Sequence, residues 1–514
     1  MTIRHKFPYR EHDVLRWTRS KGDSFWARQR ETQALTLFHQ AAQRIPAYKD
    51  FLKKNRITPD KIRTWKDFQL VPPVTKKNYL RNYPLRQLLW DGSLKEPMVF
   101  TATSGSTGEP FYFPRNRQLD WQYSIIIEQF LRNSSYGATT PTLVIVGFGM
   151  GVWIGGLITY QAYEMATRRA GIPASIITPG VNKEEIFSAL KRLAPNFQQV
   201  ILVGYPPFIK DIIDEAPAHG IDIKKLNLRI MSAAEAYTET FRDYIVQKGG
   251  VRNVYRDVLN VYGSADIGAM ATETPFTIFT RRLATQHRPF FERVFGSINK
   301  TPTLAQYNPL FITFEAVDDE VLLTGQNQLP LVRYAIGDNG GVRTPEEIRS
   351  MAEAEGIDFD KAARAEKLSP YFTNLPMVYV YERKNLSTTL YGINIYPEYI
   401  RDALMHPKAQ QYTTGKFTMI TKYDEHNNQR LEINLELKKG NAATNKQREE
   451  LHTIIVSALR SRSSEFQELT NHIGARAHPT VILWKAEDST HFKPGIKQRW
   501  VKKDDDQNNN NHNK

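Results

Sequence analysis

The chain has 514 residues, which suggests about three or four domain equivalents at ~150 residues each. Hydrophobic residues make up 41% and charged residues 24%, which excludes a fibrous or wholly disordered chain. The chain contains no cysteine, so a disulfide framework, a cysteine nucleophile, a thiolate zinc site and an iron–sulfur cluster are excluded. The net charge of +15 favours a polyanionic partner, such as nucleic acid, an acidic membrane or a phosphorylated small molecule.

The first 97 or so residues predict mostly helix, with an amphipathic run from Phe25 to Leu52. The start of the chain has no apolar run typical of a secretory signal, so we expect a cytoplasmic location. The uncharged stretch from Thr142 to Tyr160 has the length of a membrane span. Its glycines instead divide it into a strand, a loop and a buried helix, which is the interpretation we favour.

Between about 140 and 265, short β-branched runs alternate with helical patterns. The strand candidates are Leu143 to Val146, Ala174 to Ile177, Val200 to Val203, Leu228 to Met231 and Val258 to Val261. This alternation predicts parallel strands joined by crossover helices. Asn182, with Glu185 three residues later, predicts the start of one such helix.

The second half of the chain contains a polar insert and a smaller unit. Thr344 and Glu347 predict a helix start in an insert that runs to about Lys367 and that we expect to decorate the surface. We expect a helix from Asn445 to Ser461, flanked by strands near 416–422, 430–436 and 480–484. The fold class is therefore α/β, with a large multi-sheet N-terminal domain (1–383), a small α+β domain (384–502) and a disordered polar tail (503–514).

The loop from Thr103 to Gly108 packs four hydroxyl groups and two glycines into six residues. Glycines let backbone N–H groups converge on one anion, and hydroxyl groups add further donors, so such a loop can wrap a polyphosphate. No Gly-Lys-Ser/Thr follows, which excludes a Walker A loop. Taken by itself, such a loop is more often a flexible Ser/Gly surface segment than a phosphate site.

Two further motifs place carboxylates after predicted strands. VYGSADIG (Val261 to Gly268) contains Asp266, and RYAIGD (Arg333 to Asp338) ends on Asp338. Ligands of α/β sheets collect beyond the carboxyl ends of strands, so both acids are candidate ligand contacts.

In order and spacing, these three motifs resemble those of the adenylate-forming enzyme superfamily, and within it the phenylacetate-CoA ligase-like group, over roughly residues 40 to 501. Four further segments look alike: VPPVTKKNYLRNYP, GFGMGVWIGG, SAAEA (232–236) and YGINIYPEYI (391–400). The resemblance implies that ATP and Mg²⁺ activate a carboxylic acid as an acyl-adenylate, and that the acyl group passes to the thiol of CoA or of a carrier. It also implies a mobile C-terminal domain.

The resemblance also implies roles for particular residues. Nucleotide contacts would come from Thr103, Ser104, Gly105, Ser106, Thr107, Gly108, Ala234, Glu235, Tyr262, Gly263, Ser264 and Asp338. Within this set Tyr262 would pack on the adenine and Asp338 would accept the ribose hydroxyls, while Asp266 would hold Mg²⁺. Lys497 and Thr107 would act on the reacting phosphate, with Lys493 as the alternative lysine.

The acid pocket and the hinge are implied in the same way. Phe148, Trp153, Tyr205 and Pro206 would line the pocket, and Arg383 and Asn385 would form the hinge. Aromatic rings there predict an apolar or aromatic acid, although the same rings could be ordinary core. The sequence departs from the family pattern where Asp266 replaces Glu, Glu109 replaces Lys, Asn385 replaces Asp and Tyr391 replaces Arg.

Three functions remain open: an acid–CoA ligase, an adenylate-forming enzyme that delivers the acyl group to an amine, hydroxyl or carrier protein, and a non-catalytic nucleotide-binding relative. The sequence has no HExxH and no GxSxG, which disfavours a zinc protease and a serine hydrolase. The basic residues are spread along the chain, which disfavours a nucleic-acid partner. A homodimer is left open.

Overall fold

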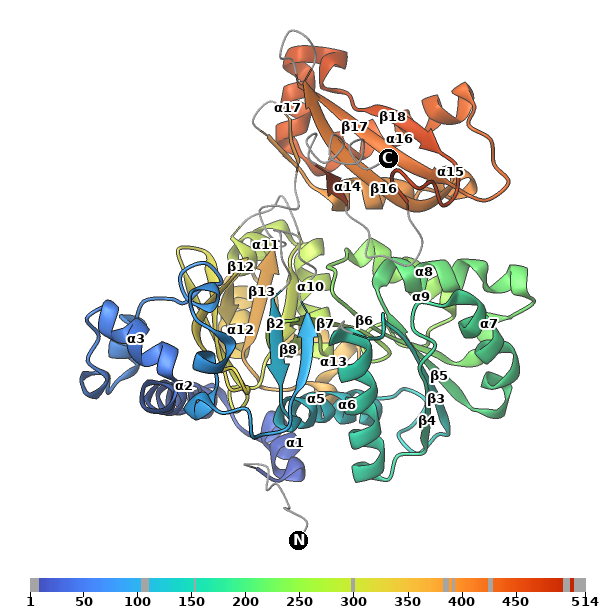
Figure 1. The fold of residues 1–514 in the computed structure, drawn as a ribbon. Helices are drawn as coiled ribbons and strands as arrows, with labels where there is room; N and C mark the ends of the chain where they lie inside the picture. The colour runs from blue at the N-terminus through green and yellow to red at the C-terminus, as the bar shows by residue number, and fades with distance from the viewer. Residues whose placement is uncertain are drawn as a thin grey trace. The chain divides into compact units, whose positions relative to one another are not determined.

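The computed structural model describes residues 9–102, 111–151, 154–296, 301–381, 388–390, 393–423, 429–492 and 500–502 (Figure 1). Contacts divide the chain into two units, Met1–Ala236 with Lys248–Tyr381, and Tyr237–Gln247 with Glu382–Lys514. Each unit has its own sheet and hydrophobic core. Within the described ranges, no helix combines the length and the apolar character that crossing a membrane requires.

The N-terminal segment is helical, as predicted. Its helices are α1 (Glu11–Ser20), α2 (Asp23–Arg44), α3 (Pro46–Lys54) and α4 (Trp65–Gln69). The amphipathic run divides at Pro46, because proline lacks the backbone donor of a helix interior and disfavours helical geometry at the residue before it. Phe38 of α2 and Tyr48 of α3 are buried in the same cluster.

Five parallel strands form one half of the large sheet. They are β3 (Thr142–Gly147), β4 (Ala174–Ile177), β5 (Gln199–Gly204), β6 (Leu228–Ala233) and β7 (Val258–Ser264), in the spatial order β7-β6-β5-β3-β4. The segments between them contain α6 (Ile154–Ala170), α7 (Lys183–Arg192), α8 (Pro206–Glu215) and α9 (Glu239–Gly249). The predicted alternation is confirmed.

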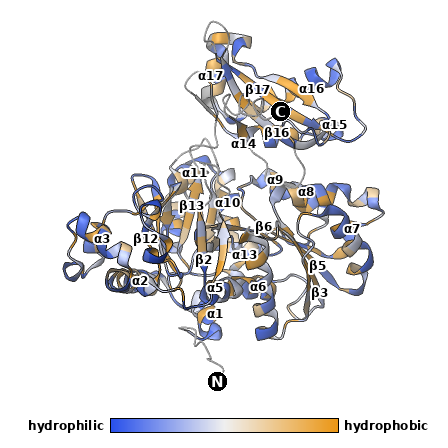
Figure 2. Ribbon diagram, viewed as in Figure 1, coloured by the Kyte–Doolittle hydropathy of each residue, from blue (hydrophilic) through white to orange (hydrophobic). Residues whose placement is uncertain are grey.

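The two faces of these strands are covered. Figure 1 shows α6 and α7 on opposite sides of β3, and every residue of β3 and β5 is buried. Figure 2 shows apolar residues on these strands and hydrophilic residues on outer helices such as α7. Burial on both faces explains why the strands read as continuous apolar runs.

The other half of the large sheet is antiparallel. Its strands are β8 (Gly268–Thr272), β9 (Thr303–Gln306), β10 (Ile312–Val317), β11 (Glu320–Gly325), β12 (Leu331–Arg343) and β13 (Met377–Tyr381), in the order β10-β11-β12-β13-β9-β8, and β8 pairs with β7. A separate hairpin, β1 (Val99–Ala102) and β2 (Tyr112–Arg115), precedes α5 (Arg117–Arg132). The helices α10 (Pro275–Gln286) and α11 (Arg288–Phe295) follow β8.

Both predicted helix starts are confirmed, and most residues of the insert are exposed or half-exposed, as expected, while one apolar face packs on the core. The side chain of Asn182 accepts a hydrogen bond from the Glu185 backbone at 3.3 Å. Thr344 and Glu347 form a reciprocal capping box at the start of α12 (Pro345–Glu353), which α13 (Phe359–Ala365) follows. Apolar side chains at helical spacing, including Ile348, are buried in a core cluster with residues of α10, α11 and β13.

The second unit contains a four-stranded sheet, a two-stranded sheet formed by β14 and β15, and helices, and it also includes most of α9. Its elements are β14 (Thr388–Leu390), β15 (Ile393–Ile395), α14 (Pro397–Leu404), α15 (Pro407–Tyr412), β16 (Thr413–Tyr423), β17 (Gln429–Leu437), α16 (Asn445–Arg462), α17 (Ser464–Ile473), β18 (Thr480–Trp484) and β19 (Val501–Lys502). The sheet order is β18-β17-β16-β19. The predicted helix and three strands are present, and the predicted α/β fold class is confirmed.

A buried ion pair joins the parallel strands to their surroundings. Arg229 of β6 lies 2.9 Å from Asp257, and both side chains are 0% exposed. Asp257 also accepts hydrogen bonds from the backbone and hydroxyl of Ser135, while Arg229 donates to the Phe130 carbonyl. The ion pair itself is therefore fully desolvated.

We expect Asp257→Asn to destabilise the protein by about 3–5 kcal/mol, because it leaves the buried Arg229 guanidinium without its counter-charge. Asp91→Asn is the control, since the Arg44–Asp91 pair is 48% and 57% exposed and an exposed pair contributes little to stability, so its loss should shift the unfolding midpoint far less. Urea unfolding followed by tryptophan fluorescence measures both. Equal shifts in the two variants would contradict the structural account.

Candidate functional site

The carboxyl ends of four neighbouring parallel strands carry the candidate residues. Phe148 directly follows β3, Tyr205 follows β5, Ala234 follows β6, and Asp266 lies two residues beyond β7. These strands are adjacent in the order β7-β6-β5-β3. Ligands of open α/β sheets bind at this edge, so the fold brings these residues to the expected place.

Two of the predicted pocket aromatics contact each other at this edge. The rings of Phe148 and Tyr205 pack edge to face, with centroids 5.0 Å apart. Phe148 is buried in the core, whereas Tyr205 is half-buried. Burial raises the pKa of Tyr205, a backbone hydrogen bond from Gly149 opposes this shift, and the charge of Glu235 adds to it. Tyr205 and Glu235 therefore lie within electrostatic reach of each other, while Phe148 is largely a core residue.

The turn after β6 has an unusual backbone. Ala234 adopts φ +76°, a left-handed conformation that costs a non-glycine residue about 1–2 kcal/mol. Side chains from β6 and β7 hold this turn: Asn260 donates from Nδ2 to the Glu235 carbonyl at 2.9 Å, and its Oδ1 lies 3.1 Å from Ser232 Oγ. Strain that its surroundings hold in place is typical of ligand-binding turns.

The end of β7 lies so close to β8 that only glycine fits at one of its positions. A Cβ at Gly263 would lie 2.7 Å from the Gly268 carbonyl oxygen, closer than van der Waals contact allows. Ser264 Oγ accepts a hydrogen bond from the Asp266 backbone at 3.2 Å. The motif therefore fixes the position of Asp266 through its backbone.

Asp338 lies where β12 changes its pairing. Ala335 pairs with Leu322 of β11, but the next partners are Asn339 and Glu320, so extra residues bulge from the strand. Gly337, within this bulge, has φ +88°. Bulges redirect side chains, and here the Tyr262 hydroxyl donates to Asp338 Oδ2 at 2.6 Å. The structure thus brings Tyr262 and Asp338 together.

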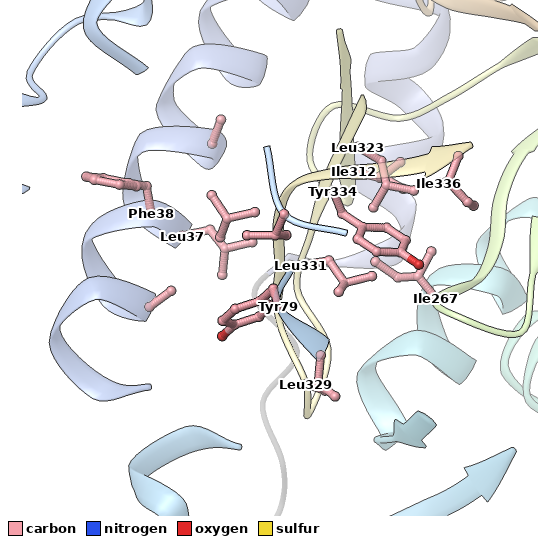
Figure 3. Packing of buried hydrophobic residues seen from close by; sticks show 14 of the residues in the cluster. Leu37, Phe38, Tyr79, Ile267, Ile312, Leu323, Leu329, Leu331, Tyr334 and Ile336 are labelled. Carbon is pink, nitrogen blue, oxygen red and sulfur yellow. The ribbon is translucent and has the colours of Figure 1, made fainter. Parts of the chain in front are cut away.

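Asp266 is buried, and its carboxylate has two side-chain partners that the sequence did not identify. Lys76 Nζ lies 3.2 Å from Oδ1 and 3.1 Å from Oδ2. The Tyr334 hydroxyl donates to Oδ2 at 2.6 Å. Figure 3 shows the Tyr334 ring in an apolar cluster with Ile267, which stiffens this partner. Lys76 and Tyr334 both lie in segments that carry the family resemblance, but no local pattern predicts that they meet Asp266.

The donor set at Asp266 can be compared with the needs of Mg²⁺. Nucleotide enzymes often hold Mg²⁺ through one or two carboxylates, with substrate phosphates and water as the other oxygen ligands. Over the ranges that the structure covers, no group of three or more His, Cys, Asp or Glu side chains could hold a metal. Asp266 can supply one carboxylate and fits such a shared site, with the other ligands coming from phosphate and water.

The hairpin that carries the hydroxyl-rich loop begins beside Asp266. Thr101 Oγ1 of β1 lies 3.4 Å from the Ala265 carbonyl oxygen and 3.4 Å from that of Phe113 in β2. The flanking strands are thus anchored next to the acid. Several predicted residues lie outside the described residues: Thr103, Ser104, Gly105, Ser106, Thr107, Gly108, Trp153, Arg383, Asn385, Lys493, Lys497 and the tail 503–514.

The chain is similar in sequence to a curated protein. No family model matches the chain. Over 229 residues it is 26% identical to the phenylacetate-coenzyme A ligase of Pseudomonas putida, a match that covers 44% of this chain and 48% of that protein. The match thus spans about half the length of this curated relative.

The fold has solved counterparts. A crystal structure of 2-hydroxyisobutyryl-CoA ligase in the postadenylation state, in complex with R3-HIB-AMP, matches with a TM-score of 0.64 and 15% identity over 97% of this chain and 94% of that chain. A second structure of that ligase, with 2-HIB-AMP, gives a TM-score of 0.62 over 95% and 92%. At this identity the likeness establishes the fold. Sequence and structure agree: the chain has the fold of the adenylate-forming enzymes and resembles their phenylacetate-CoA ligase-like group.

Proposed function

We propose that the protein activates a carboxylic acid with ATP to an acyl-adenylate and transfers the acyl group to CoA. The observation that carries this proposal is a convergence of three separate segments, namely the end of β7 with the turn after it, the bulge in β12, and the β1–β2 hairpin. The Tyr262 hydroxyl contacts Asp338, and Tyr262 lies four residues before Asp266, so this short segment links the two acids. The hairpin that bears the hydroxyl-rich loop is anchored beside Asp266 by the contact of Thr101 with the Ala265 carbonyl oxygen. The relatives in sequence and fold are named as acid–CoA ligases, which supports the same reaction.

In the first step, a carboxylate oxygen of the acid bonds to the α-phosphorus of ATP, and the bond to the β-phosphate breaks to release pyrophosphate. Such a step needs positioning and compensation of negative charge more than covalent help from the protein. Asp338, oriented by the Tyr262 hydroxyl, would accept the ribose hydroxyls. When bound at Asp266, Mg²⁺ would neutralise charge on the phosphate oxygens.

The remaining contacts of this step follow from the resemblance. Backbone and hydroxyl donors of Thr103 to Gly108 would hold the phosphates, with Thr107 nearest the reaction. Lys497, or its alternative Lys493, would place a positive charge on the α-phosphate. Arg383 and Asn385 would be the hinge between residues 1–383 and 384–502. In the second step the thiolate of CoA would attack the acyl carbon and release AMP.

We propose an apolar or aromatic acid as the substrate. The half-buried Tyr205 presents its ring at the end of β5, the buried Phe148 ring packs against it, and Pro206 opens α8 beside them. The segments FGMGVW and YPPF that contain these residues have no basic side chain, so they offer no partner for a second carboxylate. A homodimer and a cytoplasmic location remain predictions from the sequence.

Pyrophosphate release over a panel of carboxylic acids, with and without CoA, tests the proposed reaction. We expect release that depends on the acid, and formation of a thioester when CoA is present. Release without a thioester would indicate that the acyl acceptor is an amine, a hydroxyl or a carrier protein and not CoA. The sequence departs from the family pattern at Asn385 and Tyr391, so this outcome is tested explicitly. No release with any acid would favour a non-catalytic nucleotide-binding relative.

We expect Asp338→Ala to raise the KM for ATP by roughly 10- to 100-fold, because a hydrogen bond to a charged group contributes about 1.5–3 kcal/mol. Tyr262→Phe keeps the ring but removes the hydroxyl that orients Asp338, so its effect should be smaller. Initial rates of pyrophosphate release at varied ATP measure both variants. An unchanged KM for ATP in Asp338→Ala would contradict the ribose role.

Lys497→Ala should abolish pyrophosphate formation and leave acyl transfer from a supplied acyl-adenylate to CoA largely intact, since the lysine charge is needed only at the phosphate. Lys493→Ala is the matched control and should keep both half-reactions. Separate assays of the two half-reactions distinguish the variants. If Lys493→Ala loses adenylation and Lys497→Ala keeps it, the roles of the two lysines are exchanged.

A further inference from the structure

Lys76 is bound to the carboxylate that the proposed function assigns to the metal. Its Nζ lies 3.2 Å from Oδ1 and 3.1 Å from Oδ2 of Asp266, so it bridges both oxygens. The Asp266 side chain is 3% exposed, whereas that of Lys76 is 29% exposed. The carboxylate is therefore enclosed by protein, while its cation keeps access to solvent.

A buried clamp holds the segment that delivers Lys76. The Arg333 guanidinium makes two 3.1 Å contacts with the Glu315 carboxylate, and both side chains are 4% exposed. The same guanidinium donates to the carbonyl oxygens of Gln69 and Val71. Two backbone carbonyls just before Lys76 are thus fixed by a charged group from the RYAIGD motif.

Backbone hydrogen bonds continue this docking toward Lys76. The Val74 N–H donates to the Arg333 carbonyl at 3.0 Å, and the Ala335 N–H donates to the Val74 carbonyl at 2.9 Å. Lys76 follows two residues later, and its Nζ lies 5.5 Å from the centroid of the Phe113 ring in β2. The contacts of Gln69, Val71 and Val74 therefore hold the segment that positions Lys76 beside Asp266.

The chemistry of the carboxylate creates a conflict between Lys76 and a metal ion. A buried carboxylate without a counter-charge is costly, so a cation at Asp266 stabilises the empty site. A carboxylate offers about four lone-pair sites, and the hydrogen bonds from Lys76 and Tyr334 already occupy some of those of Asp266. Two cations on one carboxylate also repel each other. A metal ion at Asp266 therefore competes with the lysine for the same oxygens.

We propose that Lys76 takes the place of the divalent cation at Asp266 until the nucleotide arrives, and that the metal–nucleotide complex displaces it. This inference rests on the proposed function, because it takes Asp266 as the metal ligand. The Lys76 side chain is 29% exposed, and the flexible four-carbon stem of lysine lets the displaced ammonium turn toward solvent. No bond is made or broken, and one positive charge changes its partner.

The consequence is a protein that binds nucleotide with reduced dependence on the metal. Without metal, Lys76 cancels the charge of Asp266 that would otherwise repel the phosphates. Lys76→Met keeps the length and apolar stem of the side chain but removes the charge. In that variant metal-free nucleotide should bind much more weakly, while binding in the presence of metal should change little.

Isothermal titration calorimetry with α,β-methylene-ATP, which resists attack at the reacting bond, measures this dependence directly. The quantity compared is the ratio of the Kd in EDTA to the Kd in Mg²⁺. We expect Lys76→Met to raise this ratio by at least about tenfold, which corresponds to ~1.4 kcal/mol. Lys76→Arg keeps the charge, and Lys77→Met removes an exposed neighbouring charge, so both should stay within about twofold of the unmodified protein.

Tyr334→Phe separates charge from orientation, because it removes the other hydrogen bond to Asp266 without removing a charge. The ratio of the two Kd values for this variant should stay within about threefold of that of the unmodified protein.

An unchanged ratio in Lys76→Met, or an equal rise in Tyr334→Phe, would overturn the role of Lys76 while leaving the proposed function intact. Asp266→Asn should lower the ratio toward one, and a ratio equal to that of the unmodified protein would overturn both the metal role of Asp266 and this inference. A failure of the unmodified protein to bind the nucleotide in either condition would instead contradict the proposed function itself.

Discussion

The buried carboxylate of Asp266 is the constraint around which the candidate site is organised. It cannot be enclosed without compensation of its charge, and Lys76 and Tyr334 supply that compensation from two segments distant in the chain. Lys76 can compensate this charge only if its segment is held in place, and Arg333 and backbone hydrogen bonds dock that segment on β12. Charge compensation thus links the N-terminal segment, the turn after β7 and β12 into one structure.

The sheet supplies the rest of the arrangement. Parallel strands place Phe148, Tyr205 and Ala234 at one edge, next to the turn that carries Asp266. The bulge in β12 then directs Asp338 toward Tyr262, only four residues before Asp266. Strand ends and a bulge are backbone features, so the positions of the candidate ligand contacts depend on the fold more than on any single side chain.

Local signals in the sequence predicted much of this fold, whereas long-range contacts could not be predicted. The cap at Asn182, the capping box at Thr344 and the parallel strands each depend on neighbouring residues, and each is present. The insert after Thr344 reads as polar, and the packing of its one apolar face depends on partners elsewhere in the chain. Lys76 meets Asp266 across 190 positions, so only the folded structure could identify that pair. The family resemblance supplied the roles of Asp266 and Asp338, which neither spacing nor composition determines.

A crystal structure of the protein with α,β-methylene-ATP and Mg²⁺ tests the central claim most directly. The account predicts one nucleotide whose ribose contacts Asp338 and whose phosphates lie between Asp266 and the loop from Thr103 to Gly108, with Lys76 no longer bridging the Asp266 carboxylate. A nucleotide bound away from these two acids, or an Asp266–Lys76 pair unchanged beside a bound metal ion, would contradict it.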